Sequence, residues 1–87
     1  MEPFEIRWRV STRKDLRKIP AHDVVRIVAA VEDLADNPYP SGCAKLSGVE
    51  RTHRIRVGDF RIIYVVEASP RVVEIIRVRN RRDVYRS

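Results

Sequence analysis

Residues 51–67 read RTHRIRVGDFRIIYVVE, two runs of alternating polar and apolar side chains on either side of Gly58-Asp59. Alternation with a period of two is typical of strands that bury one face. A two-residue connection that begins with glycine is typical of a hairpin closed by a type II′ turn. The sequence therefore predicts two antiparallel strands, at about 51–57 and 60–67.

The two-residue turn also determines which side chains share a face. It places Arg56 opposite Arg61, on the same face as Arg54, whereas His53 and the alternating apolar residues share the other face. Like charges directly opposite each other destabilise a sheet unless an anion or a carboxylate answers them, and the hairpin has no acid opposite these arginines. A solvated charged face explains a single surface arginine well enough. For three arginines on one face we favour a phosphate-binding surface.

The first half of the chain predicts a strand followed by helices. Alternation predicts a strand over 4–10, and Ser11 or Thr12 offers an N-cap for a short helical segment after it. Apolar residues at three- and four-residue spacing predict a longer helix over 21–36, which ends before two prolines.

Residues 71–79 predict the last strand, so the order of elements is β-α-α-β-β-β. Because the strands are clustered and do not alternate with helices, this order predicts an α+β fold with a mostly antiparallel four-stranded sheet. We expect a single small domain over residues 1–87, with the helical pair on one face of the sheet and a short C-terminal tail or helix.

The formal net charge of +6 is concentrated in the second half of the chain. Lys and Arg balance Asp and Glu in residues 1–50, whereas residues 51–87 contain ten arginines, no lysine and four acidic residues. The planar guanidinium group contacts phosphate through paired hydrogen bonds. The charge pattern therefore favours a nucleic acid or another polyanion as partner.

Composition argues against several other classes of protein. Charges interrupt the apolar runs before a membrane span could form, and residues 1–10 lack the apolar stretch of a secretion signal. The single cysteine, Cys43, cannot form an internal disulfide, and without closely spaced histidines or a second cysteine it predicts no metal site. We interpret His22 and His53 as structural. We therefore expect a cytoplasmic protein that makes no membrane contact.

Three segments taken together resemble the RelE/ParE superfamily of toxins, and within it the RelE branch. They are Lys45-Leu46-Ser47-Gly48, residues 54–64, and Arg79-Asn80-Arg81-Arg82-Asp83-Val84-Tyr85-Arg86. The resemblance extends over nearly the whole chain. It implies the toxin of a type II toxin–antitoxin system, which enters the ribosomal A site and cleaves the mRNA there. In such enzymes the 2′-hydroxyl of the RNA attacks the adjacent phosphate, and the resemblance implies that no metal or cofactor is needed.

The resemblance also implies a set of catalytic residues: Arg54, Arg56, Arg61, Arg81 and Tyr85. Our hypothesis places Arg56 and Arg61 on the scissile phosphate, with Arg54 stabilising charge. Arg81 would lie near the leaving 5′-oxygen, and Tyr85 would stack on a base or assist deprotonation of the 2′-hydroxyl. Further RNA contacts are expected from other basic residues of the chain: Lys45, Arg51, Arg77, Arg79 and Arg82.

Studied relatives have lysines at the positions of Arg54 and Arg56. Arginine effectively never loses its proton, so neither residue is a general base. Either Tyr85 is the base, or the site relies on positioning the RNA.

The family implies an antitoxin partner whose acidic or amphipathic helix covers the basic face. The other expected partners are the ribosome and mRNA, with operator DNA bound only through the antitoxin complex. Two alternatives remain open from the sequence. One is a ParE-like inhibitor of DNA gyrase on the same fold, because a fold does not determine a function. The other is a basic RNA-binding or ribosome-binding module without catalytic activity.

Overall fold

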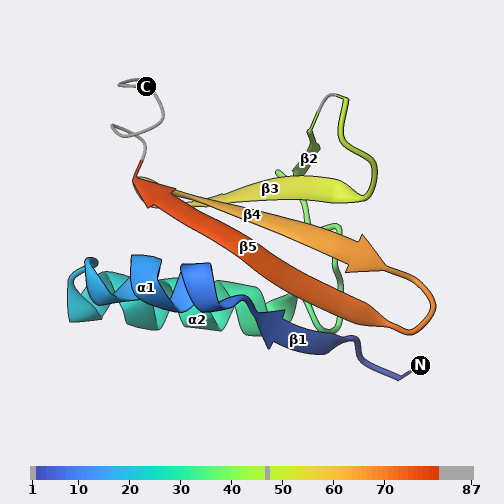
Figure 1. Cartoon of the computed structure of the whole chain (residues 1–87), viewed down its shortest axis with the longest axis horizontal. Helices are drawn as coiled ribbons and strands as arrows, with labels where there is room; N and C mark the ends of the chain where they lie inside the picture. The colour runs from blue at the N-terminus through green and yellow to red at the C-terminus, as the bar shows by residue number, and fades with distance from the viewer. Residues whose placement is uncertain (1, 47, 81–87) are drawn as a thin grey trace.

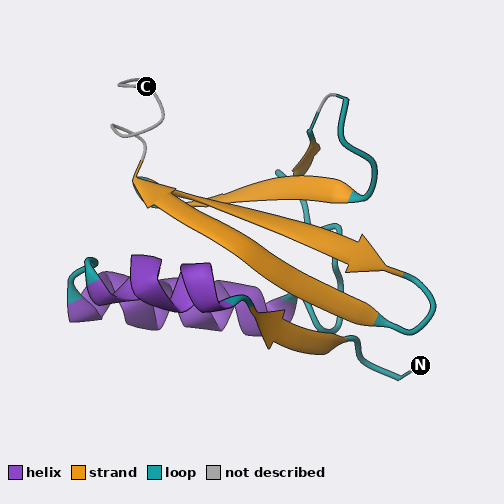
Figure 2. Cartoon of the chain, in the orientation of Figure 1, coloured by secondary structure: helices purple, strands orange, loops and turns teal. Residues whose placement is uncertain are grey.

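The computed structural model describes residues 2–46 and 48–80 of the chain. Two helices lie together on one side of a twisted sheet, and the other face of the sheet is open (Figures 1 and 2). In chain order the elements are β1 (Glu5–Trp8), α1 (Val10–Arg17), α2 (Ala21–Asp33), β2 (Ala44–Lys45), β3 (Thr52–Val57), β4 (Phe60–Glu67) and β5 (Val72–Asn80). No helix in this described part is long and apolar enough to span a membrane.

The sheet has five strands in the order β1-β5-β4-β3-β2, one more than the sequence predicted. The additional strand is β2, whose two residues are too few to show an alternating pattern. The sheet is also mixed, since β1 pairs with β5 in parallel while the other three pairs are antiparallel. The predicted α+β class, the order of the main elements and the helical pair on one face are confirmed.

The predicted register of the β3–β4 hairpin is confirmed residue by residue. Val57 pairs with Phe60, and Arg56 pairs with Arg61. Gly58 has a φ of +58°, whereas Asp59 is not among the residues of positive φ, which is the combination that a type II′ turn requires. The turn is therefore of the predicted type, and it aligns the two strands.

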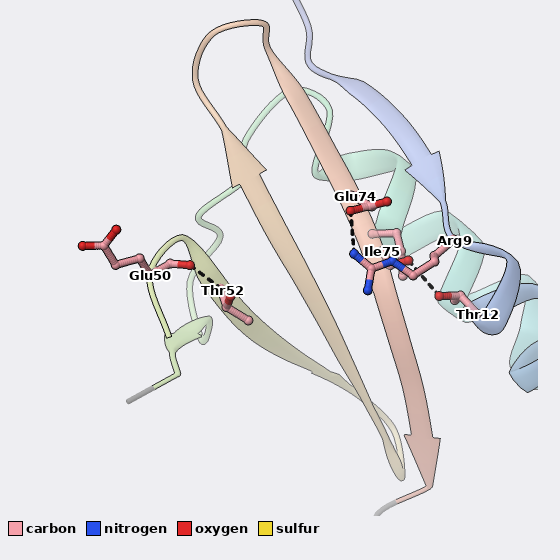
Figure 3. A network of polar contacts seen from close by, with 6 residues as sticks. All are labelled: Arg9, Thr12, Glu50, Thr52, Glu74 and Ile75. Carbon is pink, nitrogen blue, oxygen red and sulfur yellow. Dashed lines mark hydrogen bonds and ion pairs between the residues drawn. The ribbon is translucent and has the colours of Figure 1, made fainter. Parts of the chain in front are cut away.

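Helix α1 begins two or three residues earlier than expected, and the predicted caps, Ser11 or Thr12, are wrong. Arg9 occupies the N-cap position without a side-chain capping bond. Thr12 is instead fully buried, and its hydroxyl donates a 2.7 Å hydrogen bond to the carbonyl oxygen of Ile75 in β5 (Figure 3). Because β1 runs beside β5 and leads directly into α1, the first turn of the helix lies against that strand.

Helix α2 ends at Asp33, before the predicted Asp36. The next three amides bond to carbonyls only three residues back, so the helix tightens into turns before Pro38. Its apolar stripe, with Ile27 and Val31 fully buried, packs on the helical face of the sheet. The sheet residues of this core are Ile55, Phe60, Ile62, Tyr64, Val66, Val73, Ile75 and Val78.

An aromatic cluster closes one end of the core. Tyr64 is fully buried, its hydroxyl donates to the carbonyl oxygen of Pro38 at 2.7 Å, and burial raises the pKa of this phenol. The ring of His53 stacks on Tyr64 with centroids 5.9 Å apart and meets Tyr39 edge-on at 5.0 Å. His53 thus packs in the core-facing layer, as its place in the alternation predicted.

Candidate nucleic-acid interface

The open face of the sheet carries a row of three arginines from adjacent strands. Arg56 of β3 pairs with Arg61 of β4, which in turn pairs with Arg79 of β5. Directly opposite residues on neighbouring strands have Cβ atoms about 4.5–5.5 Å apart, so the three side chains leave the sheet side by side. Alternation places them away from the helices, because the residue next to each along its strand (Ile55, Ile62 and Val78) belongs to the core.

A second row lies next to the first along the strands. Arg54 pairs with Ile63, and Ile63 pairs with Arg77, so two arginines flank one apolar residue. We call the five arginines of the two rows the arginine face: Arg54, Arg56, Arg61, Arg77 and Arg79. The sequence predicted that Arg54, Arg56 and Arg61 share a surface, and the register of the hairpin confirms this prediction.

A β-bulge in β5 brings its two arginines to this face. The register shifts between Ile63 and Tyr64, which pair with Arg77 and Ile75 respectively, so that Ile76 is the extra residue on β5. In a regular strand without the bulge, Ile75 and Arg77 would share a face, so Arg77 would point toward the helices. Bulges are frequent beside functional sites, where they change the direction of a side chain. The only sequence signal for it is the doublet Ile75-Ile76, which interrupts the alternation.

Within residues 2–46 and 48–80, no carboxylate forms an ion pair with any arginine of the arginine face. Arg56 is exposed and the other four arginines are half-buried, with their aliphatic stems along the sheet. The acidic residues of the same face lie toward its other end. There Glu67 binds Arg51 at 2.7 Å, and Glu74 binds Arg9 at 2.9 Å (Figure 3).

This distribution separates a charge-paired end of the face from an end with excess positive charge. At the basic end, the like charges of the first row repel one another in the free protein. Because no described carboxylate pairs with them, these guanidinium groups are available to bidentate anions, and phosphate is the anion that they fit best.

The structure does not bring every predicted contact residue to the arginine face. Lys45 pairs in register with His53, and directly opposite residues share a face, so Lys45 belongs to the other side of the sheet. Arg51 immediately precedes β3, and its guanidinium group is paired with the carboxylate of Glu67. The remaining predicted residues, Arg81, Arg82 and Tyr85, lie outside the residues that the structure describes, and their assignment stays a prediction.

A small basic α+β domain whose open sheet face carries arginines without an ion-pair partner in residues 2–46 and 48–80 defines a class of protein suited to bind a polyanion. The family model described as "ParE toxin of type II toxin-antitoxin system, parDE" matches residues 6–85. The chain therefore belongs to this toxin family, within the RelE/ParE superfamily of type II toxin–antitoxin systems.

Relatives and solved structures agree with this assignment. The chain is 31% identical over 85 residues to toxin RelG of Mycobacterium tuberculosis, covering 97% of this chain and 98% of the relative. It superposes on the archaeal RelE–RelB complex from Pyrococcus horikoshii with a TM-score of 0.81 and 25% identity, over 91% of this chain and 96% of that one. The toxin–antitoxin complex RelBE2 of M. tuberculosis gives a TM-score of 0.79 and 27% identity, over 90% and 98% of the two chains.

Proposed function

We propose that this chain is a cytoplasmic, ribosome-dependent endoribonuclease that stops translation by cleaving mRNA in the ribosomal A site. The observation that carries the proposal is the row Arg56, Arg61 and Arg79, which aligns three guanidinium groups without an acidic partner among the described residues. Two relatives that match almost the whole chain are named toxin RelG and toxin RelE, which supports the RelE branch of the superfamily.

The chemistry fits a site made mostly of arginines. The 2′-hydroxyl oxygen attacks the neighbouring phosphorus to form a 2′,3′-cyclic phosphate, while the bond from phosphorus to the 5′-oxygen breaks. The phosphorane between these states carries more negative charge than the starting diester. A preorganised row of cations stabilises that additional charge, which is the largest contribution that such a site can make.

Proton transfer needs a group other than these arginines. The proton of the 2′-hydroxyl must go to a base, and the leaving 5′-oxygen must receive one, but a guanidinium group stays protonated throughout. Tyr85 remains the candidate base that the family resemblance implies. The arginines of the two rows can therefore contribute in two ways, by orienting the RNA and by stabilising negative charge.

An antitoxin is the expected regulatory partner. The similar structures from P. horikoshii and M. tuberculosis are toxin–antitoxin complexes. For this chain we propose an antitoxin with an acidic or amphipathic helix that supplies the missing counter-charge to the arginine face. Ribosome and mRNA are the proposed targets, and operator DNA is bound only through the antitoxin complex.

Induction in cells followed by primer extension on mRNA tests the proposed function. We expect codon-phased breaks with the parent chain and their loss, together with relief of growth arrest, in Arg61→Ala. Arg13→Ala removes the same side chain from an exposed position of α1 and should keep the breaks. Full toxicity of Arg61→Ala with unchanged mRNA breaks would remove the arginine row from the mechanism.

The ParE description of the family model keeps inhibition of DNA gyrase as a second candidate. Filamentation and DNA damage after induction, without mRNA breaks, would favour it. A non-catalytic RNA-binding module would instead bind ribosomes with strong salt dependence and leave mRNA intact.

A further inference from the structure

A groove lies on the open face beside the second arginine row. It is open to solvent and has a volume of about 460 Å³, within the range of roughly 300–1,000 Å³ typical of small-ligand sites. Its lining combines four aliphatic side chains with two hydroxyls and two arginines: Leu46, Val49, Ile63, Ile76, Ser11, Thr52, Arg9 and Arg77. A largely apolar hollow with a few polar groups at its rim is the usual composition of a site for a flat organic ligand.

The bulge in β5 creates this composition. It places the adjacent residues Ile76 and Arg77 in the same groove lining, although neighbours along a regular strand point to opposite faces. Ile63, the partner of Arg77 in the second row, lies beside them. The bulge thus combines an apolar surface with a cation at one point of the sheet.

The two arginines of the groove differ in their availability. Arg9 is held by Glu74 at 2.9 Å, whereas Arg77 has no ion-pair partner among the described residues. Thr52 is buried, and its hydroxyl donates to the carbonyl oxygen of Glu50 at 3.1 Å (Figure 3). Within the described part of the chain, the groove therefore combines an apolar floor with one arginine that has no ion-pair partner.

The spacing of residues along β5 determines how far the groove lies from the first arginine row. Arg77 and Arg79 are two residues apart on β5, which corresponds to about 7 Å along a strand. An extended RNA chain whose phosphate lies on the first row can place a neighbouring nucleotide over the second row. The base of that nucleotide then faces the aliphatic floor, and its phosphate or ribose faces Arg77.

We propose that this groove is a nucleobase subsite, which binds one base next to the phosphate held by Arg56, Arg61 and Arg79. This inference takes its substrate class from the proposed function. It deepens that function, because it assigns base recognition to residues outside the first arginine row. Ile63 and Ile76 contact the base plane, Val49 closes the rim, and Arg77 binds the adjoining phosphate. Val49 is suited to this place because 52% of its surface is exposed in the free protein.

Methyl NMR on the purified chain tests the subsite without any cleavage step. The probes are the four ribonucleoside 5′-monophosphates, and ribose 5-phosphate serves as the ligand without a base. We expect the nucleotides to shift the methyl signals of Leu46, Val49, Ile63 and Ile76. At least one nucleotide should bind roughly 10-fold more tightly than ribose 5-phosphate, the order expected for contact with one base plane.

A pair of matched substitutions assigns the shifts to the groove. Val49→Trp fills it and should reduce nucleotide affinity to that of ribose 5-phosphate. Val25→Trp makes the same change on α2, where Val25 is 69% exposed, and should leave binding unchanged. The amide spectrum of each variant reports whether the fold is kept.

Equal shifts with ribose 5-phosphate and nucleotides would overturn the subsite, as would nucleotide binding that Val49→Trp leaves intact. Methyl shifts that occur only with an antitoxin, and never with nucleotides, would also overturn it, because the groove would then be a protein-docking site. Loss of mRNA breaks in cells would not affect these readouts. Failure of the proposed function and failure of the subsite are therefore separate results.

Discussion

Neutralising the middle arginine of the first row should stabilise the free protein. Arg61 has a like charge directly opposite on each side, from Arg56 and Arg79, and no described acid pairs with it. Repulsion between directly opposite like charges costs roughly 0.2–1 kcal/mol per pair. Arg61→Gln removes two such pairs and keeps a polar side chain that covers part of the same surface. We therefore expect a gain of about 1 kcal/mol in the free energy of unfolding at low salt.

Thermal unfolding at two salt concentrations measures this gain. For a domain of this size, about 1 kcal/mol corresponds to a rise in Tm of roughly 4–8 °C. The rise should shrink in about 1 M salt, where the Debye length is only about 3 Å. Arg51→Gln is the matched control, since it breaks the ion pair with Glu67 and should leave stability unchanged or lower it slightly. A lower Tm for Arg61→Gln, or a gain that salt does not reduce, would refute the view that this row stores repulsion.

Three further predictions concern the scaffold that holds the face. Thr12→Val removes the hydroxyl donor to the carbonyl of Ile75, which still accepts from the amide of Arg9 at 3.1 Å, and should lower the free energy of unfolding by about 0.5–1.5 kcal/mol in urea titrations; an unchanged midpoint would mean that the bond does not tie α1 to β5. Gly58→Ala should cost about 1 kcal/mol or more, because φ is +58° there and an added Cβ would lie 3.3 Å from a guanidinium nitrogen of Arg26; equal stability in the same titration would contradict the turn geometry. Burial raises the pKa of Tyr64, so its contribution to stability is fully present below the unfolded pKa of about 10 and is lost as pH rises above it; Tyr64→Phe should flatten the alkaline limb of a stability–pH curve, and an unaltered slope would argue against this assignment.

The parts of the fold that depend on neighbouring residues were predictable from the sequence. The register of the hairpin follows from a turn of two residues, so the sequence alone predicts that Arg54, Arg56 and Arg61 share a face. The helical stripe of α2 is equally local, and it was predicted except for its last residues.

The parts that depend on distant pairing were not predictable in the same way. The parallel contact of β1 with β5 joins the two ends of the chain, and β2 is too short to leave a pattern. The bulge at Ile76 depends on how β5 pairs with β4, so the row formed by Arg61 and Arg79 could not be derived from alternation alone. Tyr85 and the other C-terminal residues of the predicted site remain predictions from family resemblance.

The tightness of the Gly58-Asp59 turn has a consequence for how this protein can vary. Surface turns usually tolerate insertions and deletions, because few contacts depend on their length. Here one added or lost residue that shifted the pairing of β4 by one position would exchange the two sides of that strand. Arg61 would then point beneath α2, and Ile62 would point into solvent. Evolution can therefore change the identity of residues around this turn far more readily than its length.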